Sequence, residues 1–230
     1  MRNTLLIFAF LGLTFTACDA QKDNSAGKDT DVQRINDYIG DKDYGDYQEA
    51  TLAGGCFWCT EASFERIEGV VDVISGYSGG ERPYPTYYQV AGGNTKYAEA
   101  IQIYYDPEVI SYEEILEIFF VAHDPTTLNR QGPDVGPQYR SAIFYRNDQE
   151  LDAAKKVIEQ VNKSGMYRND VVTQLAPYEE FWTAEGYHQD YYEYNPGNPY
   201  IQRVSKPKVE KVMKTFKDKL KSKYAKKVKP

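Results

Sequence analysis

Histidine and cysteine are scarce in this chain of 230 residues, which holds two histidines and three cysteines. A closed zinc site takes four ligands, most often from these two residue types. Beyond Cys56 and Cys59 only Cys18, His123 and His188 remain, and the two histidines are far apart rather than at finger-type spacing. The composition therefore disfavours a zinc site, and we expect neither a metal nor an organic cofactor.

Long apolar runs are equally scarce. The run at residues 5–13 is too short to span a bilayer comfortably, because a transmembrane helix takes about 20 residues. Arg2 precedes this run, and small residues stand between it and Cys18. A basic start, a short apolar segment and small residues before a cleavage point are typical of a secretory signal, so we interpret residues 1–17 as a signal peptide.

The cysteine at this boundary resembles the lipidated cysteine of bacterial lipoprotein signals, in which Cys18 becomes the first residue of the mature chain. Phe15 stands where an aliphatic residue is usual, and the alternative is an ordinary signal followed by a stray cysteine. Residues 18–46 are rich in Asp, Lys, Gly and Asn, which suits a lipid-anchored tether or linker. We therefore expect an extracytoplasmic, membrane-anchored bacterial protein, either periplasmic or at the cell surface.

A basic stripe interleaved with aromatic residues is missing from the body of the chain, which argues against nucleic-acid binding. The net charge of −7 is unevenly distributed. Residues 206–230 carry 11 lysines against Glu210 and Asp218, a net charge of +9, which leaves −16 on the other residues. We expect a Lys-rich C-terminal tail at 206–230 that is attracted to the acidic body or to an anionic surface.

The composition, 41% hydrophobic and 27% charged, is ordinary for a soluble globular protein, and the length allows one domain with a sizeable core. We place this domain at residues 47–205 and expect a monomer. Strand-like and helix-like segments are mixed along it, which is typical of an α+β fold. The expected strands are at residues 47–53, 70–77, 97–105, 141–145 and 171–175, and the expected helices are at residues 61–68, 86–90, 112–122, 148–163, 177–184 and 209–224.

Some of these elements carry specific local signals. Ser111 and Glu114 form a capping box at the start of one helix, and Asp148 is expected to cap the next. In the strand at residues 97–105, alternation places Glu99 on the face opposite to the alanines beside it. Residues 123–139 have little periodicity, and so long an irregular loop in a compact domain is usually either functional or disordered. The motifs within it, given below, favour a functional loop.

The stretch from Gly54 to Glu61 is predicted to be a strand end, a glycine turn and a helix start, with Cys56 near the helix N-terminus. Unpaired N–H groups there favour a negative charge, so we expect the pKa of the Cys56 thiol to be lowered and the thiolate to be a nucleophile. Cys59 lies within reach, one turn further on. A structural disulfide and a thioredoxin-like centre are the alternatives, although the thioredoxin pattern has its aromatic residue before the first cysteine.

With its neighbours included, Gly-Cys-Phe-Trp-x-x-Glu at residues 55–61 resembles the signature of the peptide methionine sulfoxide reductase A family. The resemblance runs from about Tyr47 to about Tyr200, with further matching stretches in the family's order. These stretches are Pro85-Thr86-Tyr87, Ala98-Glu99-Ala100, Tyr105-Asp106-Pro107, His123-Asp124-Pro125-Thr126, Asn129-Arg130-Gln131-Gly132, Asp134-Val135-Gly136, Gln138-Tyr139-Arg140-Ser141 and Tyr187-His188-Gln189. The resemblance implies that residues 47–205 are the catalytic domain, with a two-layer, ferredoxin-like sandwich core and long surrounding loops.

The resemblance also implies an activity and a set of catalytic roles. The expected reaction is thiol-dependent reduction of methionine S-sulfoxide, in proteins, in peptides and as the free amino acid. Cys56 is then the nucleophile at sulfur and Glu99 the acid that protonates the oxygen, with Tyr87 and Tyr139 as hydrogen-bond donors. A glutamate in a pocket of low dielectric has a raised pKa, which would let Glu99 hold that proton near neutral pH.

The remaining roles concern substrate binding and the return of the enzyme to its reduced form. Phe57 and Trp58 are expected to form a cage around the substrate S-methyl group, and Asp134 to help orient the substrate. After turnover Cys56 is a sulfenic acid, which condenses with a nearby thiol, here Cys59. An external thioredoxin-like or dithiol reductant then reduces the disulfide by exchange.

Two positions depart from the family pattern. The position of Cys59 is commonly glycine, and the family's resolving cysteines often lie near the C-terminus, whereas no cysteine follows Cys59 here. Tyr97 stands where histidine is common, which alters the hydrogen bonding beside Glu99. Two other functions stay open at this point. One is a protein thiol–disulfide oxidoreductase that uses Cys56 and Cys59, and the other is a tethered module that binds oxidised proteins without turnover.

Overall fold

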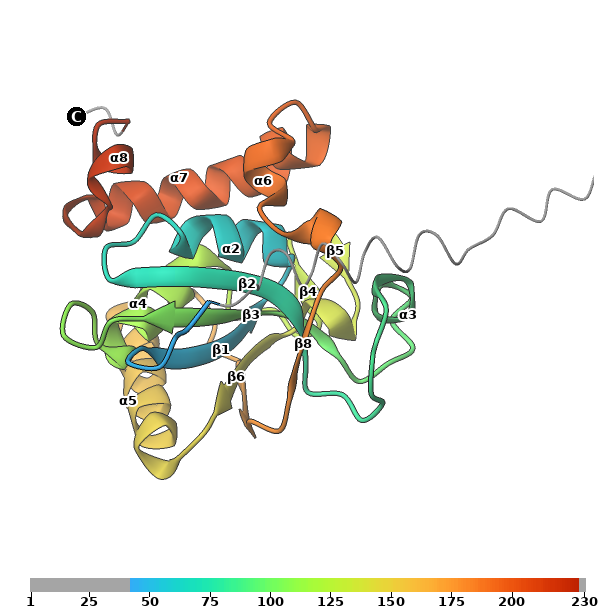
Figure 1. Cartoon of the computed structure of the whole chain (residues 1–230). Coiled ribbons are helices and arrows are strands. Elements are labelled where there is room, and N and C mark those ends of the chain that lie inside the picture. The colour runs from blue at the N-terminus through green and yellow to red at the C-terminus, as the bar shows by residue number, and fades with distance from the viewer. Residues whose placement is uncertain (1–41, 228–230) are drawn as a thin grey trace, which may run out of the picture.

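The computed structural model describes residues 42–227. The signal peptide, Cys18 and most of the tether lie outside these residues. The chain forms a mixed α/β structure around a curled sheet of six strands in the order β7-β6-β1-β3-β2-β8 (Figure 1). The strands are β1 (Gln48–Gly54), β2 (Val70–Ser78), β3 (Ala98–Tyr105), β6 (Ser141–Tyr145), β7 (Gln174–Pro177) and β8 (Phe181–Thr183).

The central strands pair antiparallel, and only the β6–β7 pair among the described strands is parallel. A separate two-stranded ribbon is formed by β4 (Arg130–Gln131) and β5 (Asp134–Val135). This ribbon lies inside the predicted functional loop, which otherwise contains only the short 3₁₀ turn η1 (Pro137–Tyr139).

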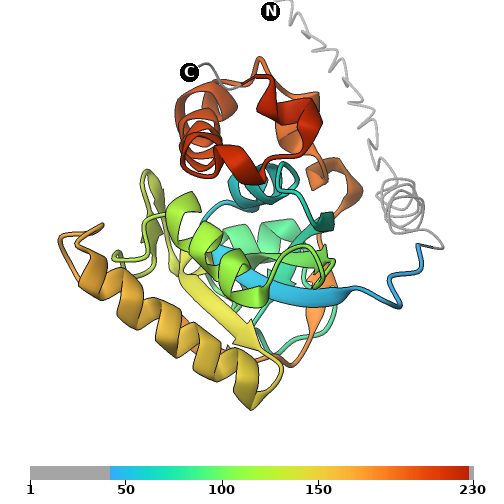
Figure 2. The same cartoon turned by 90° about the vertical axis from the view of Figure 1, so that its left-hand side faces the viewer.

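Helices cover one face of the sheet. They are α2 (Phe57–Phe64), α4 (Tyr112–Ala122), α5 (Asp148–Ser164) and α7 (Lys206–Thr215). Figure 2 shows α5 lying along β6, and Figure 1 shows α7 on the far side of α2 from the sheet. Shorter helical elements lie at the edges, namely α3 (Tyr87–Ala91), η2 (Gly186–His188), α6 (Tyr191–Tyr194), η3 (Ile201–Ser205), η4 (Lys217–Lys219) and α8 (Ser222–Ala225).

The main core lies between the sheet and these helices, as the alternation in β3 predicts. Ile101 and Ile103 point into the large apolar cluster under the helices. Ala98 and Ala100 point to the other face, into a small cluster that contains Phe144. Because side chains alternate along a strand, this register decides which residues of β3 face the helices.

Helix starts follow the sequence closely. Ser111 caps α4, its hydroxyl accepting from the Glu114 amide while the Glu114 carboxylate accepts from the Ser111 amide, so the predicted capping box is confirmed. The cap of α5 was predicted one residue too late. Asn147, rather than Asp148, is the N-cap, and its side-chain oxygen accepts from the Glu150 amide at 2.9 Å.

The segment before η2 differs from the prediction. Residues 177–184 were expected to form a short helix, but Phe181–Thr183 is the edge strand β8, which pairs with β2. Gly76 of β2 lets β8 approach, since a Cβ there would lie 2.3 Å from the Trp182 carbonyl oxygen. The strand expected at 171–175 also begins later, at Gln174. Tertiary pairing overrides the local preference in both places.

The Lys-rich segment from residue 206 packs against the body. The predicted amphipathic helix exists, but α7 ends at Thr215 rather than continuing to Tyr224. Val209 and Val212 are buried against the helices beneath, while the lysines Lys206 and Lys214 face solvent. The apolar face of α7 therefore completes the core above α2 and α4.

Candidate active site

The end of β1 and the start of α2 form the glycine turn that the sequence predicts, and Cys56 is the N-cap of α2. Gly55 has φ +88°, a left-handed conformation that favours glycine. A Cβ on Gly55 would also lie 2.4 Å from the side chain of Gln131, so β4 packs directly onto the turn that carries Cys56.

A cavity of about 300 Å³ opens at Cys56. Seven of the residues expected to act on the substrate line it together, although they come from four parts of the chain. The lining residues are Cys56, Phe57, Trp58, Tyr87, Glu99, Asp134, Tyr139, Asn198 and Tyr200. Cys59, the eighth expected residue, lies behind the wall and is 1% exposed.

Glu99 lies on β3 directly beneath the start of α2. Its carboxyl accepts a hydrogen bond of 3.1 Å from the Phe57 amide, one of the unpaired donors at the helix N-terminus. The side chain is 3% exposed, and burial raises the pKa of Glu99 to about 8 despite that hydrogen bond. Glu99 is therefore largely protonated at neutral pH, as the sequence argument expected.

Two tyrosines present hydroxyl groups to the same cavity. Burial raises the pKa of Tyr87 and of Tyr139, and the nearby carboxyl of Glu99 raises both further. Both hydroxyls are therefore neutral and available as donors. Glu185 positions Tyr87, because its carboxylate accepts from the Tyr87 amide at 2.8 Å and from the Tyr77 hydroxyl at 3.0 Å. Sequence analysis did not identify Glu185.

The indole of Trp58 is held on two sides. Its ring stacks on Tyr191 with centroids 3.9 Å apart, and its N–H donates to Nδ1 of His188 at 3.2 Å. Burial lowers the pKa of His188 to about 4, so its ring is neutral and Nδ1 is free to accept. The ring of His188 also lies 5.1 Å from that of Phe57. His188 and Tyr191 thus fix the aromatic wall.

Tyr200 is a second residue that sequence analysis missed as part of the site. Its hydroxyl donates to the Asp134 carboxylate at 2.6 Å, and it also lies within hydrogen-bonding reach of Cys56. Asn198 lines the cavity beside it. The only sequence signal for these two residues was the density of Tyr, Asn and Pro between residues 191 and 200. This composition predicts a loop, but it does not predict where the loop lies in the fold.

Comparison with known proteins identifies the family. A family model described as peptide methionine sulfoxide reductase matches residues 48–220. The chain belongs to this family. It is 56% identical over 172 residues to peptide methionine sulfoxide reductase MsrA 1 of Rhodopirellula baltica, covering 75% of this chain and 88% of the relative. It is 54% identical over 172 residues to MsrA of Saccharolobus solfataricus, covering 75% of this chain and 96% of the relative.

Solved structures agree with the sequence comparison. The reduced form of Mxr1 from Saccharomyces cerevisiae superposes with a TM-score of 0.62 at 40% identity, covering 68% of this chain and 90% of that one. Methionine sulfoxide reductase A of Corynebacterium diphtheriae gives a TM-score of 0.58 at 31% identity, covering 66% of this chain and 76% of that one.

In this methionine sulfoxide reductase family member, the two cysteines are reduced and interact with each other. Burial raises the pKa of Cys56, and the neighbouring Cys59 and Glu99 raise it further, so the predicted lowering is wrong; the residue is only 5% exposed. The hydrogen bond from Cys56 lowers the pKa of Cys59 to about 7. Of the two sulfurs, Cys59 is therefore the one on which a thiolate is favoured.

Glu61, the last residue of the family signature, does not line the cavity. It is fully buried, and burial raises its pKa well above the ordinary value. It lies inside α2 near Glu65 and Asp190.

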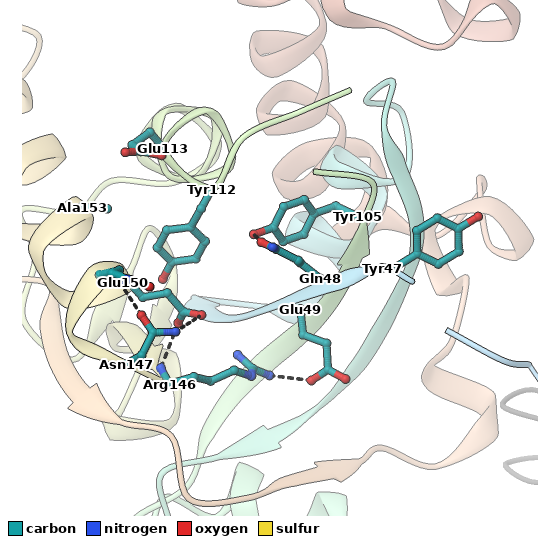
Figure 3. Close-up of a pocket in the computed structure, with 11 residues that line it drawn as sticks. Tyr47, Gln48, Glu49, Tyr105, Tyr112, Glu113, Arg146, Asn147, Glu150 and Ala153 are labelled. Atoms are coloured by element: carbon teal, nitrogen blue, oxygen red, sulfur yellow. Dashed lines mark hydrogen bonds and ion pairs between the residues drawn. The ribbon is translucent and has the colours of Figure 1, made fainter. Parts of the chain in front are cut away.

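A larger cavity, of about 590 Å³, lies at the opposite end of β1, which is about 20 Å long (Figure 3). Figure 3 shows Arg146 paired with Glu49, and Asn147 and Glu150 beside it. This cavity contains no sulfur nucleophile. The chemistry that the family signature implies therefore belongs to the smaller cavity at Cys56.

Neither a metal cluster nor a membrane span is found in residues 42–227. No group of three or more His, Cys, Asp or Glu side chains in these residues is placed to hold a metal ion. None of the helices within the same residues is long and apolar enough to cross a bilayer.

Proposed function

We propose that this protein reduces methionine S-sulfoxide, in oxidised proteins and peptides and as the free amino acid. The observation that carries the proposal is the neutral Glu99 carboxyl held at the start of α2 beside the Cys56 sulfur. Sulfoxide reduction by a thiol needs a nucleophile for sulfur and a proton for oxygen, and this site has both. Membership of the peptide methionine sulfoxide reductase family supports the same reaction.

In the first step Cys56 attacks the sulfoxide sulfur. The Cys56 proton passes to the hydrogen-bonded Cys59 sulfur, while Glu99 gives its proton to the oxygen. The hydroxyls of Tyr87 and Tyr139 donate hydrogen bonds to that oxygen without adding charge to the cavity. Phe57 and Trp58 surround the S-methyl group. The protonated oxygen is then transferred from the substrate sulfur to the Cys56 sulfur, and the substrate S–O bond and the bond between the two sulfurs break. Methionine leaves, and Cys56 becomes a sulfenic acid.

In the second step the proton that Cys59 accepted passes to the Cys56 hydroxyl, the Cys59 thiolate attacks the Cys56 sulfur, and water leaves as the disulfide forms. Cys59 is well placed because it lies one helical turn from Cys56 and already interacts with it. A thioredoxin-like dithiol protein then supplies two electrons by thiol–disulfide exchange. Cys56 and Cys59 are the only cysteines among residues 42–227, so an external thiol is the natural source of these electrons.

The test is a single turnover without reductant. Full-length protein carrying Cys18→Ser is reduced, freed of reductant anaerobically and given one portion of methionine S-sulfoxide, and the products are measured by mass spectrometry. About one methionine released per chain, with a Cys56–Cys59 disulfide mapped, is the expected result. A folded, reduced protein that releases no methionine would overturn the proposal.

A protein thiol–disulfide oxidoreductase is the competing function, because the Cys56–Cys59 pair stands at a helix N-terminus. Disulfide exchange has no oxygen to protonate, so Glu99→Gln should then change the rate little. A binding module without turnover would retain its ligand when Cys56 is replaced by serine. Loss of turnover in both variants would favour the sulfoxide reductase over these alternatives.

We also propose that the protein is a monomer anchored outside the cytoplasm through a lipid on Cys18. The support is the basic start, short apolar run and cysteine of residues 1–18, which lie outside the described residues. The mass of the mature N-terminal peptide, isolated from membranes of the source bacterium, tests this. An acylated peptide starting at Cys18 is expected, and a chain that begins elsewhere without lipid would overturn it.

A finer description of the fold is proposed as well. Read in chain order, β1, α2, β2, β3, α4 and β6 form a β-α-β-β-α-β unit whose strands lie in the order β6-β1-β3-β2. Such an arrangement is a ferredoxin-like split β-α-β sandwich, to which β7 and β8 add edges. A crystal structure with a different order for these four strands would overturn this description.

A further inference from the structure

The surroundings of Cys59 differ from those of Cys56. Cys56 lines the cavity, whereas Cys59 is buried one turn further along α2, where it faces Ser205 of η3. The Cys59 thiol lies 3.2 Å from the Ser205 hydroxyl, with Ser205 itself fully buried. The two sulfurs of the pair therefore face different environments, and only one of them borders the opening that a partner protein meets.

Lys208 is three residues after Ser205, so it lies one helical turn from the hydroxyl that contacts this sulfur. Its ammonium nitrogen is buried without a hydrogen-bond partner among the described residues. A buried ammonium group is costly unless an opposite charge compensates it. The charge of Lys208 lowers the pKa of Cys59 and also that of the buried His123 at the end of α4. Lys208 thus has a compensating anion when Cys59 is a thiolate.

The other groups around Cys59 do not replace this charge. Burial and the Asp134 carboxylate both disfavour a thiolate on Cys59, while Cys56 and Ser205 favour it through hydrogen bonds. Neutral or acidic groups complete the surroundings, namely Glu99 on β3, Tyr192 on α6 and Tyr200 beside η3. Among these groups Lys208 is the cation.

We propose that Lys208, with Ser205, is a positioning residue that holds negative charge on Cys59; this rests on the proposed reductase function. The dithiol reductant then attacks Cys56, and Cys59 departs as the thiolate. The buried position of Cys59 excludes direct attack on its sulfur. The same thiolate is the nucleophile when Cys56 is a sulfenic acid and the leaving group when the disulfide is opened.

A thiolate of the reductant attacks the Cys56 sulfur, a bond forms between these two sulfurs, and the Cys56–Cys59 bond breaks. The electron pair of the broken bond goes to the Cys59 sulfur. The second thiol of the reductant then attacks the reductant sulfur in the mixed disulfide, which frees Cys56 and leaves the reductant as a disulfide. Two electrons have then passed to the enzyme.

The first experiment maps the mixed disulfide. Full-length protein carrying Cys18→Ser is oxidised with one portion of methionine S-sulfoxide, then mixed with a thioredoxin whose second cysteine is serine, so that the exchange stops half-way. Peptide mass spectrometry should find the thioredoxin on Cys56, with Cys59 free. A bond to Cys59 would overturn the inference. Methionine release in the oxidation step reports separately on the proposed function, whatever the later linkage.

The second experiment tests Lys208 through a pH profile. In Lys208→Met the rate of disulfide formation from the Cys56 sulfenic acid is followed by quenched-flow mass spectrometry. If the loss of the charge raises the pKa of Cys59 by one, the fraction of Cys59 present as thiolate falls about tenfold at a pH below that pKa. A thiolate of higher pKa is also a better nucleophile, which offsets part of this loss, so we expect a rate about threefold slower at pH 6. Above about pH 9, where the thiolate is fully formed in both proteins, the variant should be as fast or faster.

The control is Lys206→Met, which removes a solvent-exposed lysine from the same helix and should leave the profile unchanged. Lys208→Arg keeps the charge and should restore the wild-type profile at pH 6. A purely structural role would slow Lys208→Met equally at every pH. That result, or an unchanged rate at pH 6, would overturn the role of Lys208.

Discussion

The neutral state of Glu99 makes the clearest prediction. Replacing Glu99 with glutamine keeps the size of the side chain and removes the proton that the carboxyl supplies to the sulfoxide oxygen. General acid catalysis typically contributes about 10²- to 10⁴-fold. We expect Glu99→Gln to slow methionine release in a single turnover by at least about 10²-fold at pH 7, while the fold is retained.

The pH dependence follows from the two pKa values at the site. The rate for the wild-type protein should rise as the pH passes the pKa of Cys59, about 7, because the thiolate is needed to accept the Cys56 proton. It should fall as the pH passes the pKa of Glu99, about 8, because the carboxyl loses the proton that it donates. In Glu99→Gln the rise should remain and the fall should disappear.

The same pKa has a consequence for stability. Below pH 4.5 Glu99 is protonated in both folded and unfolded chains, and between pH 4.5 and 8 only the folded chain keeps the proton. Stability supplied by this group is therefore lost as the pH rises. The pKa of Glu99 is about 3.5 higher in the folded chain, and one pKa unit corresponds to about 1.36 kcal/mol. The free energy of unfolding should therefore fall by a value on the order of 5 kcal/mol between pH 4.5 and pH 8. Glu99→Gln should not show this loss.

Two assays check these statements. Single-turnover methionine release is measured from pH 6 to 9, and urea unfolding is measured at pH 5 and pH 8 for both proteins. Glu108→Gln, which changes an exposed carboxylate after β3, is the matched control and should behave as wild type. A Glu99→Gln protein with a rate within a few-fold of wild type, or a wild-type rate that does not fall above pH 8, would refute the reasoning.

Three further predictions concern the framework of the site. Asn147→Ala removes the cap of α5 and should lower the free energy of unfolding by about 1 kcal/mol without changing the turnover rate, as urea unfolding and single turnover would show. Gly55→Ala should destabilise the protein by more than about 1 kcal/mol and reduce turnover, because φ at this position is positive and the new Cβ would collide with Gln131. An unchanged free energy of unfolding and an unchanged turnover rate would contradict the turn geometry. Val212→Ala should cost about 2 kcal/mol by thermal or urea unfolding, since its side chain is fully buried beneath the Lys-rich surface; no loss would mean that α7 does not complete the core.

The sequence by itself determined the elements that local chemistry specifies. The glycine turn before Cys56, the capping box at Ser111, the alternation of β3 and the long loop at residues 123–139 are all present as predicted. The motif resemblance named the residues that the cavity brings together, including Glu99. These predictions are correct because each depends on residues within a few positions of one another, or on a family signature whose parts together cover the whole site.

Other features depend on contacts between segments far apart in the chain, so only the tertiary structure decided them. β8 is a strand because β2 offers it an edge, although residues 177–184 favour a helix locally. Tyr200 reaches Asp134, and His188 reaches Trp58, through loops whose paths no local pattern fixes.

The charge on the cysteine pair was decided in the same way. A helix N-terminus favours a thiolate on Cys56, but burial at this site outweighs that effect and raises its pKa. The negative charge is instead favoured on Cys59, where Ser205 and Lys208 from the far end of the chain surround the sulfur. Desolvation and the distance to an ammonium group are properties of the packed molecule, which the order of residues in Cys-x-x-Cys does not specify.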